Sequence, residues 1–231
     1  MTRRPLLLYS LLLYSLLLAA TLVAADPPPL NLAQWEPDIR AFEEADQAHP
    51  PEPGGVLFAG SSSIRLWTTL AEDFPGVRVL NRGFGGSQIR EVTAFVPRIV
   101  LPYKPSLIVF YAGTNDIASG NRTAAQAADD FQEFVRSVRA SLPNTRIAFI
   151  SAAPNPARWH LRAEMQELNR RVRDRARTAD RIDFIDVWSA MLGPRGEPKA
   201  GIYRDDNLHM NAAGYEIWKR IVGDYLRAVG R

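Results

Sequence analysis

The chain contains no cysteine, and this absence removes several kinds of chemistry at once. Without cysteine there can be no disulfide, no cysteine nucleophile, no cysteine-ligated zinc site and no thiol to carry a lipid. The absence does not indicate a compartment, because a chain of 231 residues can bury a core large enough to be stable without disulfides.

Histidine is scarce, so a reaction that needs an imidazole base has few candidates. The three histidines are His49, His160 and His209. His49 lies in Pro-rich sequence, and His160 has no acidic residue close before it, which suggests a structural or substrate-pocket role. His209 follows Asp206 by three positions. A carboxylate near a histidine can orient the ring, so His209 is the candidate base.

Several well-known motifs are also missing. Gly-x-Ser-x-Gly fails because Ile64 stands two positions after Ser62, and there is neither a Gly-x-x-x-x-Gly-Lys-Ser/Thr phosphate loop nor a His-Glu-x-x-His zinc motif. Gly83-Phe84-Gly85 begins a dinucleotide fingerprint, but Gln88 occupies the place of its third glycine. These patterns therefore give no reason to expect a bound cofactor or metal.

The N-terminal 25 residues have the layout of a secretory signal. Arg3 and Arg4 precede a nearly continuous apolar stretch at 6–23, and small residues stand before Asp26. We expect cleavage near Ala25 and export to the periplasm or the extracellular space. The alternative is a retained membrane anchor, since the stretch is close to the length that can span a bilayer.

The charge balance gives no reason to expect a nucleic-acid partner. The formal net charge is +3, and removing Arg3 and Arg4 leaves 26 basic against 25 acidic residues, a net of +1. The basic run at 170–181 also contains Asp174 and Asp180, as expected of a solvated helix face. The sequence does not indicate an oligomeric state.

Short apolar runs alternate with helical patterns after a Pro-rich leader. We place the leader at 26–55, packed on the surface, and the domain at 56–231. Such alternation predicts a parallel sheet covered on both faces, a three-layer α/β/α sandwich with five strands. The predicted strands are 56–59, 77–80, 107–111, 147–150 and 182–186, and the predicted helices are 64–73, 88–100, 123–140, 161–177 and 211–229.

Polar segments follow the strands at the edge where sites form in such sheets. They are 60–64 with three serines, the Gly-rich 81–87, 113–116 (Gly-Thr-Asn-Asp) and 205–209 (Asp-Asp-Asn-Leu-His). Each alone is typical of a turn or a helix cap. Together they supply a serine at a helix start, a histidine with a carboxylate, and backbone and amide donors for an oxyanion.

In this order the four segments resemble the SGNH subgroup of the GDSL lipase/esterase superfamily, over about residues 56–229. The resemblance implies a flavodoxin-like fold and cofactor-free hydrolysis of esters or thioesters. The candidate substrates are short-chain acyl and acetyl esters, such as those of glycans or lipids. It implies a triad of Ser62, His209 and Asp206. The implied oxyanion donors are the N–H groups of Ser62 and Gly86 and the amide of Asn115.

Some alternatives stay open on the sequence. The first block of the family usually reads Gly-Asp-Ser, and here Ser61 replaces the aspartate. The three consecutive serines leave Ser61 and Ser63 as rival nucleophiles, and Gly83 is the rival backbone donor. Two other functions compete. One is a metal-dependent phosphoesterase using Asp116, Asp205, Asp206 and His209, and the other is a non-catalytic glycan-binding module.

Overall fold

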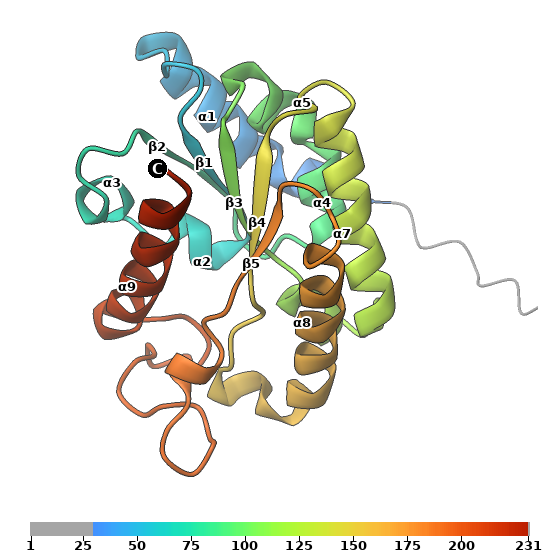
Figure 1. Cartoon of the computed structure of the whole chain (residues 1–231), viewed down its shortest axis with the longest axis vertical. Coiled ribbons are helices and arrows are strands. Elements are labelled where there is room, and N and C mark those ends of the chain that lie inside the picture. Colours follow the sequence, from blue (N-terminus) through green and yellow to red (C-terminus); the bar gives the residue numbers. More distant parts are fainter. Residues whose placement is uncertain (1–29, 231) are drawn as a thin grey trace, which may run out of the picture.

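The computed structural model describes residues 30–230, so the predicted export signal at 1–25 lies outside the described part. Within that part a five-stranded parallel sheet with the order β2-β1-β3-β4-β5 lies between two layers of helices (Figure 1). This confirms the predicted three-layer α/β/α sandwich. The strands are β1 (Val56–Gly60), β2 (Val79–Gly83), β3 (Leu107–Tyr111), β4 (Arg146–Ile150) and β5 (Ile182–Ile185).

The helices divide between the two faces of the sheet, and each layer has its own apolar core. One core packs α1, α4, α5, α7 and α8 against the sheet, and the other packs α2, α3 and α9 against the opposite face (Figure 1). Successive strand residues alternate between them: Ile108 and Phe110 face the first core, whereas Val109 and Tyr111 face the second. This is why strand β3 is apolar at every position.

The helix bounds follow the predicted pattern with local differences. The α-helices are α1 (Glu36–Ala48), α2 (Ser62–Arg65), α3 (Leu70–Asp73), α4 (Ile89–Ala94), α5 (Val96–Ile99), α6 (Thr114–Ala118), α7 (Ala124–Arg139), α8 (Arg162–Ala176) and α9 (Ala212–Val229). Short 3-10 helices are η1 (Ala33–Trp35), η2 (Leu101–Tyr103), η3 (Pro156–Leu161) and η4 (Ser189–Met191).

Two of these differences have a clear physical cause. The predicted helix at 88–100 is two helices, α4 and α5, that meet at Phe95, because Pro97 in the first turn of α5 has no N–H to continue the ladder. Strand β2 starts later than predicted and continues through Asn81 and Arg82. Their polar side chains resemble a loop in sequence, but the structure satisfies them: Asn81 Nδ2 donates to the Ile64 carbonyl at 2.7 Å.

The segment before β1 contacts the sheet and its helices through ion pairs and a tryptophan. Arg98 of α5 donates to both carboxylate oxygens of Glu43 at 2.7 Å, and buried Arg82 pairs with Asp46. Trp35 Nε1 donates to the Gly85 carbonyl at 2.7 Å, and its ring packs edge-on against Phe84. Helix α1 is thereby joined to β2 and to α5, and η1 just before it is joined to the glycine-rich turn after β2.

Two of the polar segments and the end of β3 meet around one peptide group at the end of β1. The Ser61 N–H donates to the carbonyl of Tyr111 at 2.9 Å, and the Gly60 carbonyl accepts from the Phe84 N–H at 3.0 Å. Gly60 has φ +138°, and a Cβ built on it would lie 1.9 Å from the Tyr111 oxygen. Only glycine allows the strand ends to approach this closely.

No helix in residues 30–230 is both long and apolar enough to cross a membrane.

The close approach at Gly60 predicts an unusually costly substitution. Gly60→Ala should lower the free energy of unfolding by at least about 2 kcal/mol, because the added carbon meets backbone that cannot move away and the backbone angle is strained. Gly76→Ala is the matched control, since Gly76 also has positive φ (+82°) but a Cβ added there would have no atom within 4 Å. In urea denaturation, the control should lose about 1 kcal/mol of unfolding free energy. Equal losses for the two variants would contradict the steric argument.

Candidate active site

A chain of hydrogen bonds joins Ser62, His209 and Asp206. The Ser62 hydroxyl lies 2.9 Å from His209 Nε2, and His209 Nδ1 lies 2.6 Å from an Asp206 carboxylate oxygen. A carboxylate can only accept, so Nδ1 carries the ring proton of the neutral histidine. The Nε2 lone pair then faces the serine hydroxyl. This is the arrangement in which imidazole can take a proton from serine.

The loop that carries Asp206 and His209 is closed by its own backbone. The Arg204 N–H donates to the His209 carbonyl at 2.8 Å, and the Asn207 N–H donates to the Arg204 carbonyl at 2.9 Å. Asp206 accepts from the Leu208 and His209 N–H groups, both at 2.9 Å. The hydrogen bond from the His209 ring, followed by those two N–H groups, lowers the Asp206 pKa to about 2. Asp206 is therefore ionised at neutral pH.

Ser62 differs from its two serine neighbours in its contacts. Ser62 is the first residue of α2, so its N–H has no acceptor within the helix. Ser61 is buried at the strand end, and the Ser63 carbonyl accepts from Tyr215 at 2.9 Å. Of the three serines, Ser62 is the one whose hydroxyl lies within hydrogen-bonding distance of His209.

Asn115 reaches the same place from the start of α6, after β3. Its Nδ2 donates to the Ser87 carbonyl at 3.0 Å, and its Oδ1 accepts from Arg158 Nη1 at 2.9 Å. Both Asn115 and Arg158 line the cleft that contains Ser62 and His209. An amide nitrogen carries two hydrogens, so one N–H of Asn115 remains after the bond to Ser87.

The structure distinguishes the two glycines considered as backbone donors. The Gly83 N–H donates to Asn81 Oδ1 at 2.9 Å, so it is already used. Gly86 is exposed, with φ +76°, and lines an adjacent hollow beside Trp35 rather than the cleft with Ser62. The assignment of Gly86 as a donor stays a prediction.

Other residues considered from the sequence lie apart from this group. Asp205 is exposed and does not contact the His209 ring, and His160 is exposed in η3. Asp116 is buried beneath α4, where it accepts from the Ile89 N–H. Asp116 and Asp206 therefore serve different elements and do not form one ligand set. Among residues 30–230, no cluster of three or more histidine or acidic side chains could hold a metal ion.

The cleft itself is small. It encloses about 20 Å³ of free space and is lined by Ser62, Ser63, Tyr111, Thr114, Asn115, Ala153, Pro154, Asn155, Arg158, Met191, Tyr203, Leu208, His209, Met210 and Trp218. Arg158 is the one permanently charged residue in this set, and none of the set is acidic.

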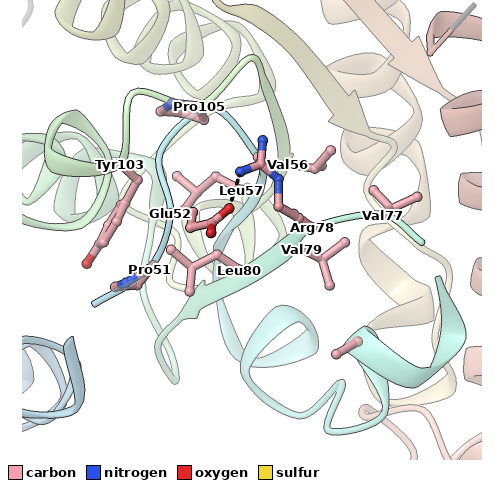
Figure 2. Close-up of a pocket in the computed structure, with 12 residues that line it drawn as sticks. Pro51, Glu52, Val56, Leu57, Val77, Arg78, Val79, Leu80, Tyr103 and Pro105 are labelled. Atoms are coloured by element: carbon pink, nitrogen blue, oxygen red, sulfur yellow. Dashed lines mark hydrogen bonds and ion pairs between the residues drawn. The ribbon is translucent and has the colours of Figure 1, made fainter. Parts of the chain in front are cut away.

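A larger hollow of about 340 Å³ lies at the other end of the strands. Figure 2 shows its apolar lining, including Leu57, Val79 and Leu80, beside the ion pair of Arg78 with Glu52. Parallel α/β sheets form their sites at the carboxyl ends of the strands, whereas this hollow lies where β1 and β2 begin. Its lining has no histidine and no serine.

Comparison with known proteins agrees with this geometry. Residues 54–217 match the GDSL-like lipase/acylhydrolase family. The chain belongs to this family. It is an enzyme that hydrolyses esters. No curated protein sequence matches the chain.

Solved structures share the fold. A GDSL-like lipase from Bacteroides thetaiotaomicron has a TM-score of 0.71 at 20% identity, covering 83% of this chain and 98% of its own. A carbohydrate esterase family 3 protein from Talaromyces cellulolyticus has a TM-score of 0.61 at 18% identity, and the match covers 76% of this chain and 97% of that protein. An acetyl-xylooligosaccharide esterase from Geobacillus Stearmophilus has a TM-score of 0.59 at 18% identity, and the match covers 78% of this chain and 96% of that protein.

The sequence patterns of this acylhydrolase do not reveal two of its contacts. Arg158 belongs to none of the four polar segments, although it follows β4 at the edge where the other groups gather, and that position is the available signal. The bond from Trp35 to Gly85 has no signal, because the partners are 50 positions apart and neither belongs to a motif that pairs them.

Asp116 joins two parts of the site region and is an unusual buried acid. Both of its carboxylate oxygens accept from the Ile89 N–H, at 3.1 and 3.3 Å, so α6 is tied to the start of α4. Burial raises the pKa of Asp116 to about 7, more than the hydrogen bonds lower it. Near neutrality this carboxyl changes its charge inside the fold.

This raised pKa predicts how stability depends on pH. A raised acid pKa favours the folded state at low pH, and that contribution is lost as pH rises from about 4 to about 7. Asp116→Asn cannot titrate, yet its oxygen can still accept from Ile89. The unfolding free energy of the variant relative to wild type should therefore rise between pH 4 and pH 8, by on the order of 4 kcal/mol at most. Urea denaturation at both pH values measures this, and a difference independent of pH would contradict it.

Proposed function

We propose that this acylhydrolase is a serine esterase in which Ser62 is the nucleophile, His209 the base and Asp206 the residue that orients the base. The observation that carries the proposal is the continuous path from the Ser62 hydroxyl through both ring nitrogens of His209 to the Asp206 carboxylate. The order of the three groups and the distances between them support this assignment, because nucleophilic catalysis requires such a path.

The reaction proceeds through an acyl-enzyme. Ser62 Oγ attacks the acyl carbonyl carbon while His209 Nε2 takes the hydroxyl proton. The ester C–O bond then breaks, and the proton passes from His209 to the leaving alcohol. Water attacks the acyl-serine and gives a proton to His209, which returns it to Ser62 as the carboxylic acid leaves. Asp206 stays ionised throughout and stabilises the protonated ring.

Three donors are proposed for the oxyanion that forms in each half of the reaction. Two of them are the Ser62 N–H and the free amide N–H of Asn115, and the contacts of both residues support this role. The third is the Gly86 N–H, proposed in preference to that of Gly83, which already donates to Asn81. Preorganised donors of this kind stabilise developing charge without reorganisation.

The proposed substrates are esters with a short acyl group, such as acetylated glycans or lipids. A free volume of about 20 Å³ next to Ser62 is close to that of a single water site. Apolar residues such as Met191, Met210 and Trp218 close the cleft. The fold similarity to an acetyl-xylooligosaccharide esterase is consistent with a small acyl group.

We also propose that the enzyme acts outside the cytoplasm, on the basis of the signal-like pattern at 1–25. Contact with a membrane would then depend on whether this segment is retained. Sequencing the N-terminus of the protein recovered from the native host would identify the cleavage site, and an intact Met1 in an exported protein would indicate an anchor.

The nucleophile can be identified by substitution and by labelling. Ser62→Ala should lower kcat by roughly 10⁴–10⁶-fold with little change in thermal stability, because the reaction loses its attacking atom. Ser63→Ala is the matched control, since Ser63 lines the same cleft without contacting His209, and it should keep activity within a few-fold. A fluorophosphonate probe should modify Ser62 in the wild-type enzyme.

The same preparation tests the rival functions. Labelling at Ser61 or Ser63 would overturn the assignment of the nucleophile. Loss of ester hydrolysis on adding a chelator, with recovery on adding a divalent ion, would indicate the metal-dependent phosphoesterase instead. Glycan binding without turnover of any ester would indicate the binding module.

The small cleft predicts a steep dependence on acyl length. With aryl esters of acetate, butyrate and octanoate, kcat/KM should fall at least about 10-fold from acetate to octanoate, because added methylenes meet packed walls. Leu208→Ala removes part of the wall and should shift the preference toward butyrate. A flat or rising series for the wild-type enzyme would exclude the acetyl preference.

A further inference from the structure

Arg158 is a half-buried cation that has no carboxylate partner in residues 30–230. Its guanidinium instead donates to the neutral amide oxygen of Asn115 at 2.9 Å. Arg122, whose side chain is 8% exposed, pairs in the ordinary way with Asp130 at 2.7 Å. Enclosing a charge without a counter-ion is costly, so the contact with Asn115 calls for an explanation.

The contact determines which way the Asn115 amide faces. A guanidinium can only donate, so the atom facing Arg158 must be Oδ1, and the Ser87 carbonyl can only accept, so the atom facing it must be Nδ2. The two partners lie on opposite sides of the amide and together exclude the flipped orientation. Without Arg158, the Ser87 carbonyl alone would hold the group, through one hydrogen bond.

The charge also changes the strength of the amide as a donor. A cation on Oδ1 draws electron density from the amide nitrogen, which makes the remaining N–H a better donor to a developing oxyanion. The effect is largest in a cleft with few competing charges. This cleft is lined by no acidic residue.

The segment that carries Arg158 is held at several points. The Arg158 N–H donates to Asn155 Oδ1 at 2.9 Å, and the Ala157 N–H donates to the carbonyl of Asn207 at 3.0 Å. Asn207 lies between Asp206 and His209 in the chain. The Tyr203 hydroxyl donates to the Pro154 carbonyl at 2.7 Å. Helix η3 therefore contacts both the amide donor and the loop of the base.

We propose that Arg158 is a positioning residue for ester hydrolysis, which orients and polarises the Asn115 amide so that its free N–H points at the oxyanion. This inference rests on the proposed function, because it assumes that Asn115 is an oxyanion donor. It assigns Arg158 no direct contact with the substrate. The consequence is that Arg158 matters only while Asn115 is present.

A double-mutant cycle tests this dependence. Arg158→Met keeps the length of the side chain and removes its charge and donors; it should lower kcat by roughly 10–100-fold, as a misplaced group does, with KM changed less than about threefold. Asn115→Ala should cost roughly 10²–10³-fold. Adding Arg158→Met to Asn115→Ala should cost less than about threefold more. Arg158→Lys should recover part of the activity, because one donor and the charge remain.

Controls separate this role from a purely structural one. Arg162→Met changes an exposed arginine that starts the next helix and should leave kcat unchanged. The rate at which a fluorophosphonate modifies Ser62 should fall in Arg158→Met as kcat falls, since the phosphoryl oxygen uses the same donors. Thermal denaturation confirms that each variant is folded.

The outcomes distinguish this inference from the proposed function. If Asn115→Ala keeps near-full activity, the oxyanion assignment itself fails. If Asn115→Ala is slow but Arg158→Met costs the same factor in both backgrounds, Arg158 acts independently and the positioning role is wrong. Wild-type activity in Arg158→Met, or a change confined to KM, would overturn it as well.

Discussion

The candidate site depends on the pairing of one peptide group, Gly60–Ser61, with both neighbouring strands. Its N–H bonds the end of β3 and its carbonyl bonds the chain just after β2, so three chain segments distant in sequence end at one point. Ser62 follows directly and begins a helix whose first N–H groups are unpaired within it. Ser62, the amide of Asn115 and the glycine-rich turn are therefore neighbours because the strands are in register.

Two polar groups of the cleft share a second property: each is held by a charged side chain. Asp206 bonds the ring of His209, and Arg158 donates to the amide oxygen of Asn115. Asp116 lies one residue along from Asn115 and ties the two helices that follow β2 and β3. These supporting groups are ionisable whereas most of the groups they hold are neutral, so the direction of a neutral donor or acceptor is set by a nearby formal charge.

Much of this arrangement follows from local pattern, and the remainder does not. Apolar runs predict the five strands, and the rule that sites form at strand ends brings Ser62, Asn115 and His209 to one edge. Strand β2 is mispredicted because Asn81 and Arg82 are polar, and nothing local says that Ile64 and Asp46 will satisfy them. The contact of Arg158 could not be predicted for the same reason. Its partner, Asn115, is 43 positions away, and a single arginine carries no periodicity.

The bond from Trp35 to the Gly85 carbonyl has a consequence for the direction of the next backbone donor. In a trans peptide the carbonyl and the following N–H point to opposite sides, so a bond that holds one also aims the other. A glycine-rich turn would otherwise allow the Gly85–Gly86 peptide plane to rotate with little resistance. Trp35, 50 residues before Gly85 in the chain, thus restricts the rotation of the Gly85–Gly86 peptide and so the direction of the Gly86 N–H. Trp35, in the segment before β1, therefore helps to set the direction of a backbone N–H that belongs to the turn after β2.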